Sequence, residues 1–179
     1  MRAIPALIVL PAALYSSAAV YAAEYLTIPA SQKALFPQAD HFTDTKLQLT
    51  DAQRDEIKRL SGVRQREARP AVWRAEHQGQ LLGWYIVDEV VGKHEFITYA
   101  AAISPQGKVL GVEVLIYRET YGYQIRETSW RDQFTGKALQ DTFKLDQDIT
   151  NITGATLSCR NVTNGIKRLL ALQQVALRS

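Results

Sequence analysis

The chain is poor in cysteine and histidine. Its 179 residues include one cysteine, Cys159, and three histidines. A single cysteine excludes an intramolecular disulfide framework, and this composition also excludes cysteine-rich zinc and iron–sulfur sites. No Cys-x-x-Cys-His segment is present for covalent haem attachment. Any redox cofactor must therefore be held by other residue types.

A large excess of one charge is also missing. Lys and Arg number 21 against 18 Asp and Glu, which gives a formal net charge of +3. This small excess argues against nucleic acid as a partner. Hydrophobic residues make up 46% and charged residues 22%, a globular balance in a chain of single-domain length. No pair of carboxylates and no Ser/His/Asp order stands out, so hydrolytic chemistry is not indicated.

The first 22 residues differ in composition from the remainder. Their only charge is Arg2, which precedes an apolar stretch from Ile4 to Val20 and a small-residue ending. This pattern predicts a secretory signal peptide over residues 1–22, and hence a periplasmic or otherwise extracytoplasmic protein. The apolar part is short for a membrane span and contains two prolines. A retained membrane anchor is therefore the weaker alternative.

Residues 23–69 are expected to form a helical lead-in. The segment Thr27–His41 suits a short helix stopped by Pro37, and Thr50 with Gln53 forms a capping box for a second helix that ends at Gly62. The arginines that follow are Arg64, Arg66 and Arg69. Such a run is typical of a solvated connector, so no functional role is assigned to it.

Beyond Pro70 the pattern changes to short apolar runs separated by turns. These runs predict four antiparallel strands, at Ala71–Ala75, Leu82–Val91, Phe96–Ile103 and Val109–Tyr117. Later segments predict a short helix at Ser129–Phe134 and a long one within Leu157–Leu177. The expected fold class is α+β, with an antiparallel sheet packed against a long C-terminal helix in a domain spanning residues 70–179.

The segment Thr153-Gly154-Ala155-Thr156 joins the extended region to the last helix. Gly154 and Ala155 permit close approach of the backbone to a ligand, and the first amides of the helix are unpaired donors at the positive end of its dipole. Such a turn suits a phosphate, and the hydroxyls of Thr153, Thr156 and Ser158 can donate to phosphate oxygens or be esterified. These residues alone are also compatible with a capped helix start that binds nothing.

This segment resembles the flavin-attachment motif of the FMN-binding domain found in subunits of sodium-pumping quinone reductases and Rnf-type electron-transport complexes. That motif reads Ser/Thr-Gly-Ala-Thr, followed by an aliphatic residue and Ser/Thr. The resemblance implies that FMN is joined to Thr156 through a phosphoester. It places Thr153, Gly154, Ala155, Leu157 and Ser158 around the phosphate.

Two further segments match the family in the same order. Tyr117–Gly122 resembles its Glu-Thr-x-Gly segment, and Trp130–Lys137 resembles the aromatic, Gln-Phe-x-Gly-Lys stretch that follows. The resemblance implies that Glu119 and Thr120 are hydrogen-bonding contacts to the flavin ring or ribityl chain, and that Gly122 permits close backbone approach. The matching region covers roughly residues 92–170.

Aromatic and basic side chains gather near these motifs. The aromatic residues are Tyr117, Tyr121, Tyr123 and Trp130. They are candidates to stack on the flavin ring or cover its edge, and they are also ordinary core or surface residues. Lys93 and His94 are candidates to place positive charge near the reduced ring, against the simpler interpretation as a polar strand end.

The sequence departs from the family pattern at three positions. Thr150 stands six residues before Thr156, where the flavin transferase typically recognises an acid, and the nearest acid is Asp148. Tyr121 replaces the usual proline, and Cys159 replaces the usual Ser or Thr. A lone small thiol at this place is expected to be packed and inert. These departures indicate a divergent or stand-alone member of the family.

Together the observations favour an exported electron-transfer protein that carries FMN over a self-contained enzyme. No catalytic and no metal-ligating residue is assigned. The expected partners are a flavin transferase for maturation and redox proteins, such as a cytochrome or a membrane electron-transport complex. Two alternatives stay open: an FMN-dependent reductase of a small acceptor, and a non-redox binding or assembly module of a membrane complex.

Overall fold

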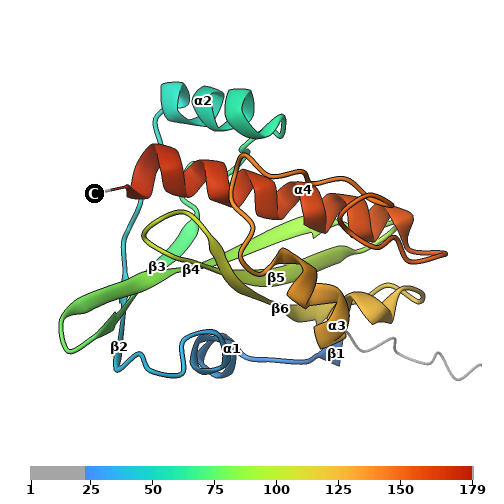
Figure 1. The fold of residues 1–179 in the computed structure, drawn as a ribbon, viewed down its shortest axis with the longest axis horizontal. Coiled ribbons are helices and arrows are strands. Elements are labelled where there is room, and N and C mark those ends of the chain that lie inside the picture. Colours follow the sequence, from blue (N-terminus) through green and yellow to red (C-terminus); the bar gives the residue numbers. More distant parts are fainter. Residues whose placement is uncertain (1–22, 179) are drawn as a thin grey trace, which may run out of the picture.

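A six-stranded antiparallel sheet, in the order β1-β6-β5-β4-β3-β2, forms the centre of the protein. The structure is a computed structural model that describes residues 23–178. Helix α4 (Thr156–Leu172) lies on one face of the sheet with α2 (Asp51–Ser61) packed on its outer side, and α1 (Ile28–Leu35) lies on the other face (Figure 1). This arrangement confirms the predicted α+β class. The predicted signal peptide, residues 1–22, lies outside the described residues.

The four predicted strands are all present. They are β3 (Ala71–His77), β4 (Gln80–Val91), β5 (Phe96–Ile103) and β6 (Val109–Tyr117). The first two are longer than expected, because they run to the ends of the tight turn that joins them. Gln78 and Gly79 in this turn both have positive φ angles, of 50° and 78°. That backbone twist suits a two-residue β-hairpin connection.

Two short strands were not predicted. They are β1 (Ala23–Glu24), which pairs with β6, and β2 (His41–Asp44), which pairs with β3. With two and four residues, neither is long enough for a hydrophobic pattern to stand out in the sequence. Each pairs at an outer edge of the sheet. The lead-in is therefore not purely helical, since its strands extend the sheet of the following domain at both edges.

The two lead-in helices begin and end where their capping residues indicate. Helix α1 (Ile28–Leu35) begins after Thr27, whose hydroxyl accepts a hydrogen bond from the amide of Ala30, and it ends before Pro37. Helix α2 (Asp51–Ser61) has the complete capping box of Thr50 and Gln53. It ends at Gly62, whose φ of 76° is left-handed and therefore favours glycine.

The segment after β6 is built from short helical turns and one long helix. The short elements are the 3₁₀ helix η1 (Tyr123–Arg126), α3 (Thr128–Arg131) and the 3₁₀ helix η2 (Asp132–Phe134). The long helix α4 (Thr156–Leu172) continues as a π-helical turn, η3 (Gln173–Leu177). None of the helices within residues 23–178 has the length and apolar character required to cross a membrane.

Both faces of the sheet are covered by apolar contacts. On one face α4 buries Val162, Ile166 and Leu169 against the central strands. Burial of such a side chain contributes about 1.5–3 kcal/mol. On the other face Phe36 packs near Tyr85, whose hydroxyl forms a buried hydrogen bond with that of Ser31 in α1. The sheet is thus held rigidly between helices, and the loops at its ends are positioned by that core.

Candidate functional site

The turn Thr153–Gly154 leads directly into α4 and is open to solvent. Gly154 has a φ of 84°, and no atom outside its chain neighbours would lie within 4 Å of a Cβ placed there. The amide of Ala155 donates to the carbonyl of Ile152 at 2.9 Å, which closes the turn. Thr153 and Gly154 are exposed, and Thr156 is half-buried. A ligand can therefore approach the backbone of this turn from solvent.

The start of α4 has no side-chain cap. Its N-cap residue is Ala155, whose methyl group offers no hydrogen-bond acceptor, and within the described residues no side chain accepts from the first turn in its place. The first amides of a helix carry a partial positive charge and attract anions. The turn is therefore a helix start without a side-chain cap, and its free amide donors are compatible with an anionic group such as a phosphate.

Two of the predicted motifs meet at Gly122 and Ala155. Gly122 has a φ of 85°, and a Cβ at this position would overlap the Cβ of Ala155 and lie 2.9 Å from the Tyr117 hydroxyl oxygen. That hydroxyl donates a hydrogen bond to the carbonyl of Tyr121. The structure thus brings the Tyr117–Gly122 segment against the beginning of α4.

Tyr117 and Ser158 form a buried polar pair under this contact. Burial raises the pKa of Tyr117 to about 12, although the neighbouring hydroxyl of Ser158 acts in the opposite direction. Tyr117 therefore stays protonated and donates at neutral pH. Ser158 is buried as well, so its hydroxyl lies beneath the turn, whereas those of Thr153 and Thr156 lie nearer the surface.

The third motif clamps the backbone just before the turn. The indole N–H of Trp130 donates to the carbonyl of Thr150 at 2.8 Å, and the amide of Thr150 donates to Oε1 of Gln133 at 2.7 Å. The Gln133 amide in turn donates to the carbonyl of Trp130 at 2.9 Å. The side chain of Thr150 is exposed. Sequence reasoning matched these residues to the family without finding this role, because the contact spans separate segments.

Asp148, the acid nearest to position 150, is already engaged. Its carboxylate accepts from Lys137 Nζ at 2.7 Å and from the amide of Lys144 at 2.8 Å. Burial tends to raise the pKa of Asp148, but these hydrogen bonds outweigh it and lower the pKa. Asp148 is thus a charged partner of Lys137 that orders the loop before the turn.

Glu119 contacts the β4–β5 turn. Its Oε1 accepts from the amides of His94 at 2.6 Å and Glu95 at 3.0 Å. Burial tends to raise the pKa of Glu119, but these backbone hydrogen bonds lower it below its ordinary value. A Cβ at Gly92 would overlap this carboxylate. Glu119 therefore ties the β4–β5 hairpin to the site, and its flavin contact stays a prediction.

The other candidate residues divide between surface and core. Tyr121 is 74% exposed, Tyr123 57% and Leu157 44%, so the side chains of these three residues are open to solvent. Tyr117 and Trp130 are buried and hydrogen-bonded, which leaves them little freedom to stack on a flavin ring. Thr120, Lys93 and His94 are also exposed, and no side-chain hydrogen bond joins them to the turn before α4 within the described residues. Cys159 is buried, and burial raises the pKa of its thiol, as expected for a packed and inert cysteine.

Comparison with known proteins identifies related sequences. The sequence model of the FMN-binding domain matches residues 92–171. A relative in Clostridium ljungdahlii, a subunit of the proton-translocating ferredoxin:NAD(+) oxidoreductase complex, is 30% identical over 168 residues, which are 88% of this chain and 81% of the relative.

Two further relatives match over shorter regions. A subunit of the ion-translocating oxidoreductase complex of Stutzerimonas stutzeri is 30% identical over 114 residues, 57% of this chain and 50% of the relative. A subunit of the sodium-translocating ferredoxin:NAD(+) oxidoreductase complex of Acetobacterium woodii is 24% identical over 123 residues, 63% of this chain and 59% of the relative.

The fold is shared with a solved structure. The crystal structure of NqrC from Shewanella oneidensis aligns with a TM-score of 0.50 at 17% sequence identity, over 78% of this chain and 72% of that chain. At this identity the likeness concerns the fold alone.

Proposed function

Because the chain belongs to the family of FMN-binding domains, we propose that it is an electron-transfer protein that carries FMN on Thr156 through a phosphoester. The observation that supports this most directly is the uncapped, unobstructed turn at Gly154–Ala155, which meets the Tyr117–Gly122 segment at the start of α4. This turn offers a phosphate both backbone donors and a nearby hydroxyl that can be esterified.

Each residue of the proposed site binds a different part of FMN or supports the turn. The first amides of α4 and the hydroxyl of Thr153 hold the phosphate, with the open space at Gly154 leaving room for it and the small side chain of Ala155 allowing Gly122 to pack beneath. Ser158 supports the turn from beneath, and Leu157 offers an exposed apolar surface beside Thr156. Gly122 allows its segment to approach the attachment point closely. Glu119 and Thr120 then bind the ring or ribityl chain.

The proposed activity is a relay of electrons. FMN supplies a ring that accepts one or two electrons, and the protein orients that ring and controls its surroundings. Tyr121, Tyr123 and Leu157 are exposed around the attachment point. A ring bound there stays near the surface, where a partner protein can approach it. This geometry suits transfer between proteins better than turnover of an enclosed small substrate.

We further propose where the protein works and with which partners. Residues 1–22 direct export as a signal peptide, after which a flavin transferase attaches FMN in the periplasm. The domain that carries FMN spans residues 70–179, with residues 23–69 completing its sheet and covering it. Its relatives are named as subunits of ion-translocating complexes. We therefore place this protein at the membrane surface, where it exchanges electrons with such a complex or with a cytochrome.

The direct test is the intact mass of the exported protein after co-expression with a flavin transferase. We expect an increase equal to FMN less one water, together with flavin fluorescence on a denaturing gel. Thr156→Ala should abolish both signals and leave the circular dichroism spectrum unchanged, because the Thr156 hydroxyl caps no helix amide and alanine favours the helix. Thr142→Ala is the control, since this threonine is also exposed but has no role assigned in binding FMN.

Other outcomes would change the proposal in defined ways. Covalent flavin that persists in Thr156→Ala would move the attachment to another residue. An unmodified mass with flavin released on denaturation would mean noncovalent binding. No flavin in either form would contradict the FMN-carrying function.

A further inference from the structure

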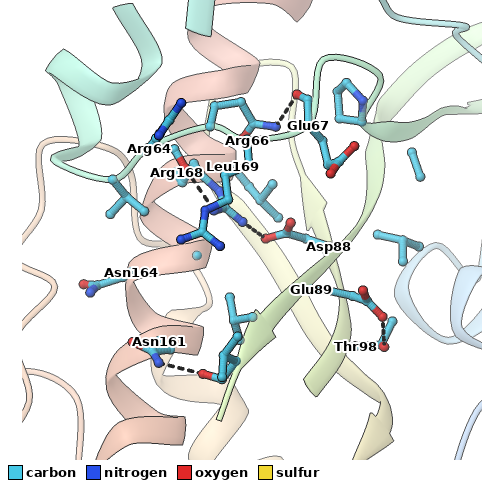
Figure 2. A pocket seen from close by; sticks show the side chains of 18 of the residues that line it. Arg64, Arg66, Glu67, Asp88, Glu89, Thr98, Asn161, Asn164, Arg168 and Leu169 are labelled. Carbon is cyan, nitrogen blue, oxygen red and sulfur yellow. Dashed lines mark hydrogen bonds and ion pairs between the residues drawn. The ribbon is translucent and has the colours of Figure 1, made fainter. Parts of the chain in front are cut away.

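A groove of about 760 Å³ lies between the connector that follows α2, the end of β4, and α4 (Figure 2). It includes Asp88 and Val90, which face α4, and also Val87, Glu89 and Val91, which alternate onto the opposite face. A groove can be lined from both faces of one strand only if it runs along the edge of that strand. None of the residues assigned to FMN lines it.

The edge of β4 is unpaired along this groove. Strand β3 begins at Ala71, which pairs with Val87, and Pro70 before it cannot continue a ladder because it has no N–H group. Strand β4 continues to Val91 and pairs there only with β5. Four residues of β4, Asp88–Val91, therefore extend past the end of their neighbour.

Free backbone groups can be assigned along this edge. The amide of Gly92 donates to the carbonyl of Glu95 across the hairpin at 2.7 Å. In an antiparallel pair every second residue bonds to the same neighbour, so the backbone groups of Asp88 and Val90 also point toward β5. Glu89 and Val91 then point their backbone groups into the groove. The carbonyl of Val91 accepts from Asn161 Nδ2 at 2.6 Å. The N–H and C=O of Glu89 and the N–H of Val91 have no backbone partner among residues 23–178.

The opposite wall holds two buried polar atoms without partners in the described part of the chain. They are Oε1 of Gln65, a residue that is 4% exposed, and Nε of Arg168, which is 9% exposed. The remaining atoms of these side chains are used: Gln65 donates to the carbonyl of Glu67, and Arg168 pairs with Asp88. Unpartnered buried polar atoms cost free energy, so this wall offers one acceptor and one donor to a group that enters the groove.

The surroundings define the chemistry of that ligand. Val87, Val90, Phe96 and Leu169 provide apolar walls. Among the ion pairs of residues 23–178, none involves the charged residues at the rim, which are Arg64, Arg66, Arg69, Glu67 and Glu89. With Asp88 neutralised by Arg168, the arginines outnumber the free carboxylates. The groove therefore favours a ligand with apolar groups and a negative charge.

We propose that this groove binds an extended, acidic segment of a partner protein, which adds to the sheet as a strand beside Asp88–Val91. A peptide backbone supplies alternating N–H and C=O groups, which can pair with the unpaired backbone groups of the β4 edge. Its side chains can contact the apolar walls and the arginines at the rim. Four strand residues extend about 13 Å. A small molecule with one donor and one acceptor would leave most of this edge unpaired. The inference is independent of the flavin.

The test is an NMR titration of the ¹⁵N-labelled mature protein with the peptide acetyl-Val-Asp-Val-Glu-Val-amide. We expect saturable shifts of the Glu89 and Val91 backbone amides and of the Gln65 side-chain amide. The same peptide N-methylated at alternate amides has the same charge and side chains but cannot pair as a strand. It should bind at least about tenfold more weakly.

A variant of the groove separates this site from nonspecific attraction. Asn164→Phe places a ring in the groove and should weaken peptide binding at least about tenfold, whereas Asn164→Ala, which leaves the groove open, should bind normally. Arg66→Glu should weaken binding and reduce its salt dependence. Backbone amide dispersion in the spectrum of each variant confirms that it is folded.

Three results would overturn the proposal. One is the absence of saturable shifts. Another is equal binding of the N-methylated peptide, which would mean attraction without strand pairing. The last is binding of free glutamate or valine as tight as that of the peptide, which would identify a small-molecule site instead.

Discussion

Gly122 packs so closely against Ala155 that any side chain at position 122 would overlap the Ala155 methyl group. The two residues belong to separate motifs, one after β6 and one at the start of α4. Their contact is what makes a single site from two stretches of sequence. It also means that the shape of the turn before α4 depends on a residue far from it in the chain.

We expect Gly122→Ala to destabilise the protein by about 1–3 kcal/mol, because the new methyl group meets Ala155 and the backbone has a left-handed φ of 85°. Covalent flavin should decrease with it as the turn is displaced. Gly154→Ala is the matched control, since it has nearly the same φ of 84° but open space around it. The midpoint of urea unfolding measures both. Equal losses in the two variants would show that backbone strain, and not the packing of Gly122 on Ala155, accounts for the effect.

Thr150→Asp should increase the fraction of protein that carries covalent FMN. The clamp by Trp130 and Gln133 holds the backbone of position 150 and leaves its side chain exposed, so the new carboxylate is presented to the transferase without rearrangement. Thr150→Asn, of the same size without the charge, is the control. The measurement is the ratio of modified to unmodified intact mass under limiting transferase. An equal ratio for both variants would show that a negative charge at position 150 does not determine how much FMN is attached.

Stability should depend on pH through Glu119. Backbone amides lower its pKa below the ordinary value of 4.5, so the folded state favours the carboxylate. The resulting stabilisation is present above about pH 4.5 and is lost as the pH falls through the lowered pKa. The wild type should therefore exceed Glu119→Gln in unfolding midpoint at pH 7, and the difference should shrink toward pH 3. A difference that stays constant over this range would contradict stabilisation by the hydrogen-bonded Glu119 carboxylate. Glu95→Gln, in the β4–β5 turn, is the control.

Asp88→Asn should destabilise the protein strongly, by about 3 kcal/mol, because it leaves the buried guanidinium of Arg168 without its counter-charge. Tyr99 donates to the same carboxylate at 2.5 Å. Tyr99→Phe removes this hydroxyl but keeps the ion pair, and should cost about 1 kcal/mol. Denaturant unfolding of both variants tests the ranking. A smaller loss for Asp88→Asn than for Tyr99→Phe would show that the ion pair contributes little.

Local patterns predicted most of the regular structure. The bounds of β5 and β6 agree with the prediction, and α2 has the capping box and terminal glycine that its sequence indicates. The two edge strands were missed because β1 and β2 are short, and their pairing depends on β6 and β3 rather than on a pattern of their own. Periodicity reports burial over several residues, and such short strands provide too few.

The candidate site was predictable only where its residues lie close together in the sequence. The turn around Thr156 was visible because glycine, small residues and hydroxyls lie together in the sequence. The arginines of the connector are exposed, as predicted for a solvated loop, and the structure adds that the connector runs along a groove with Gln65 and Arg168. Nothing local distinguishes these arginines, since their surroundings come from β4 and α4.

The sequence by itself determined the class of fold, the order of its main strands along the chain, and the run of small and hydroxyl residues before α4, because caps, turns and hydrophobic periodicity act between near neighbours. Only the tertiary structure decided that Gly122 meets Ala155, that Glu119 closes the β4–β5 turn, and that β4 extends past β3. Those relationships depend on how distant segments pack around one core, and packing depends on shape and volume in three dimensions, which no local pattern records.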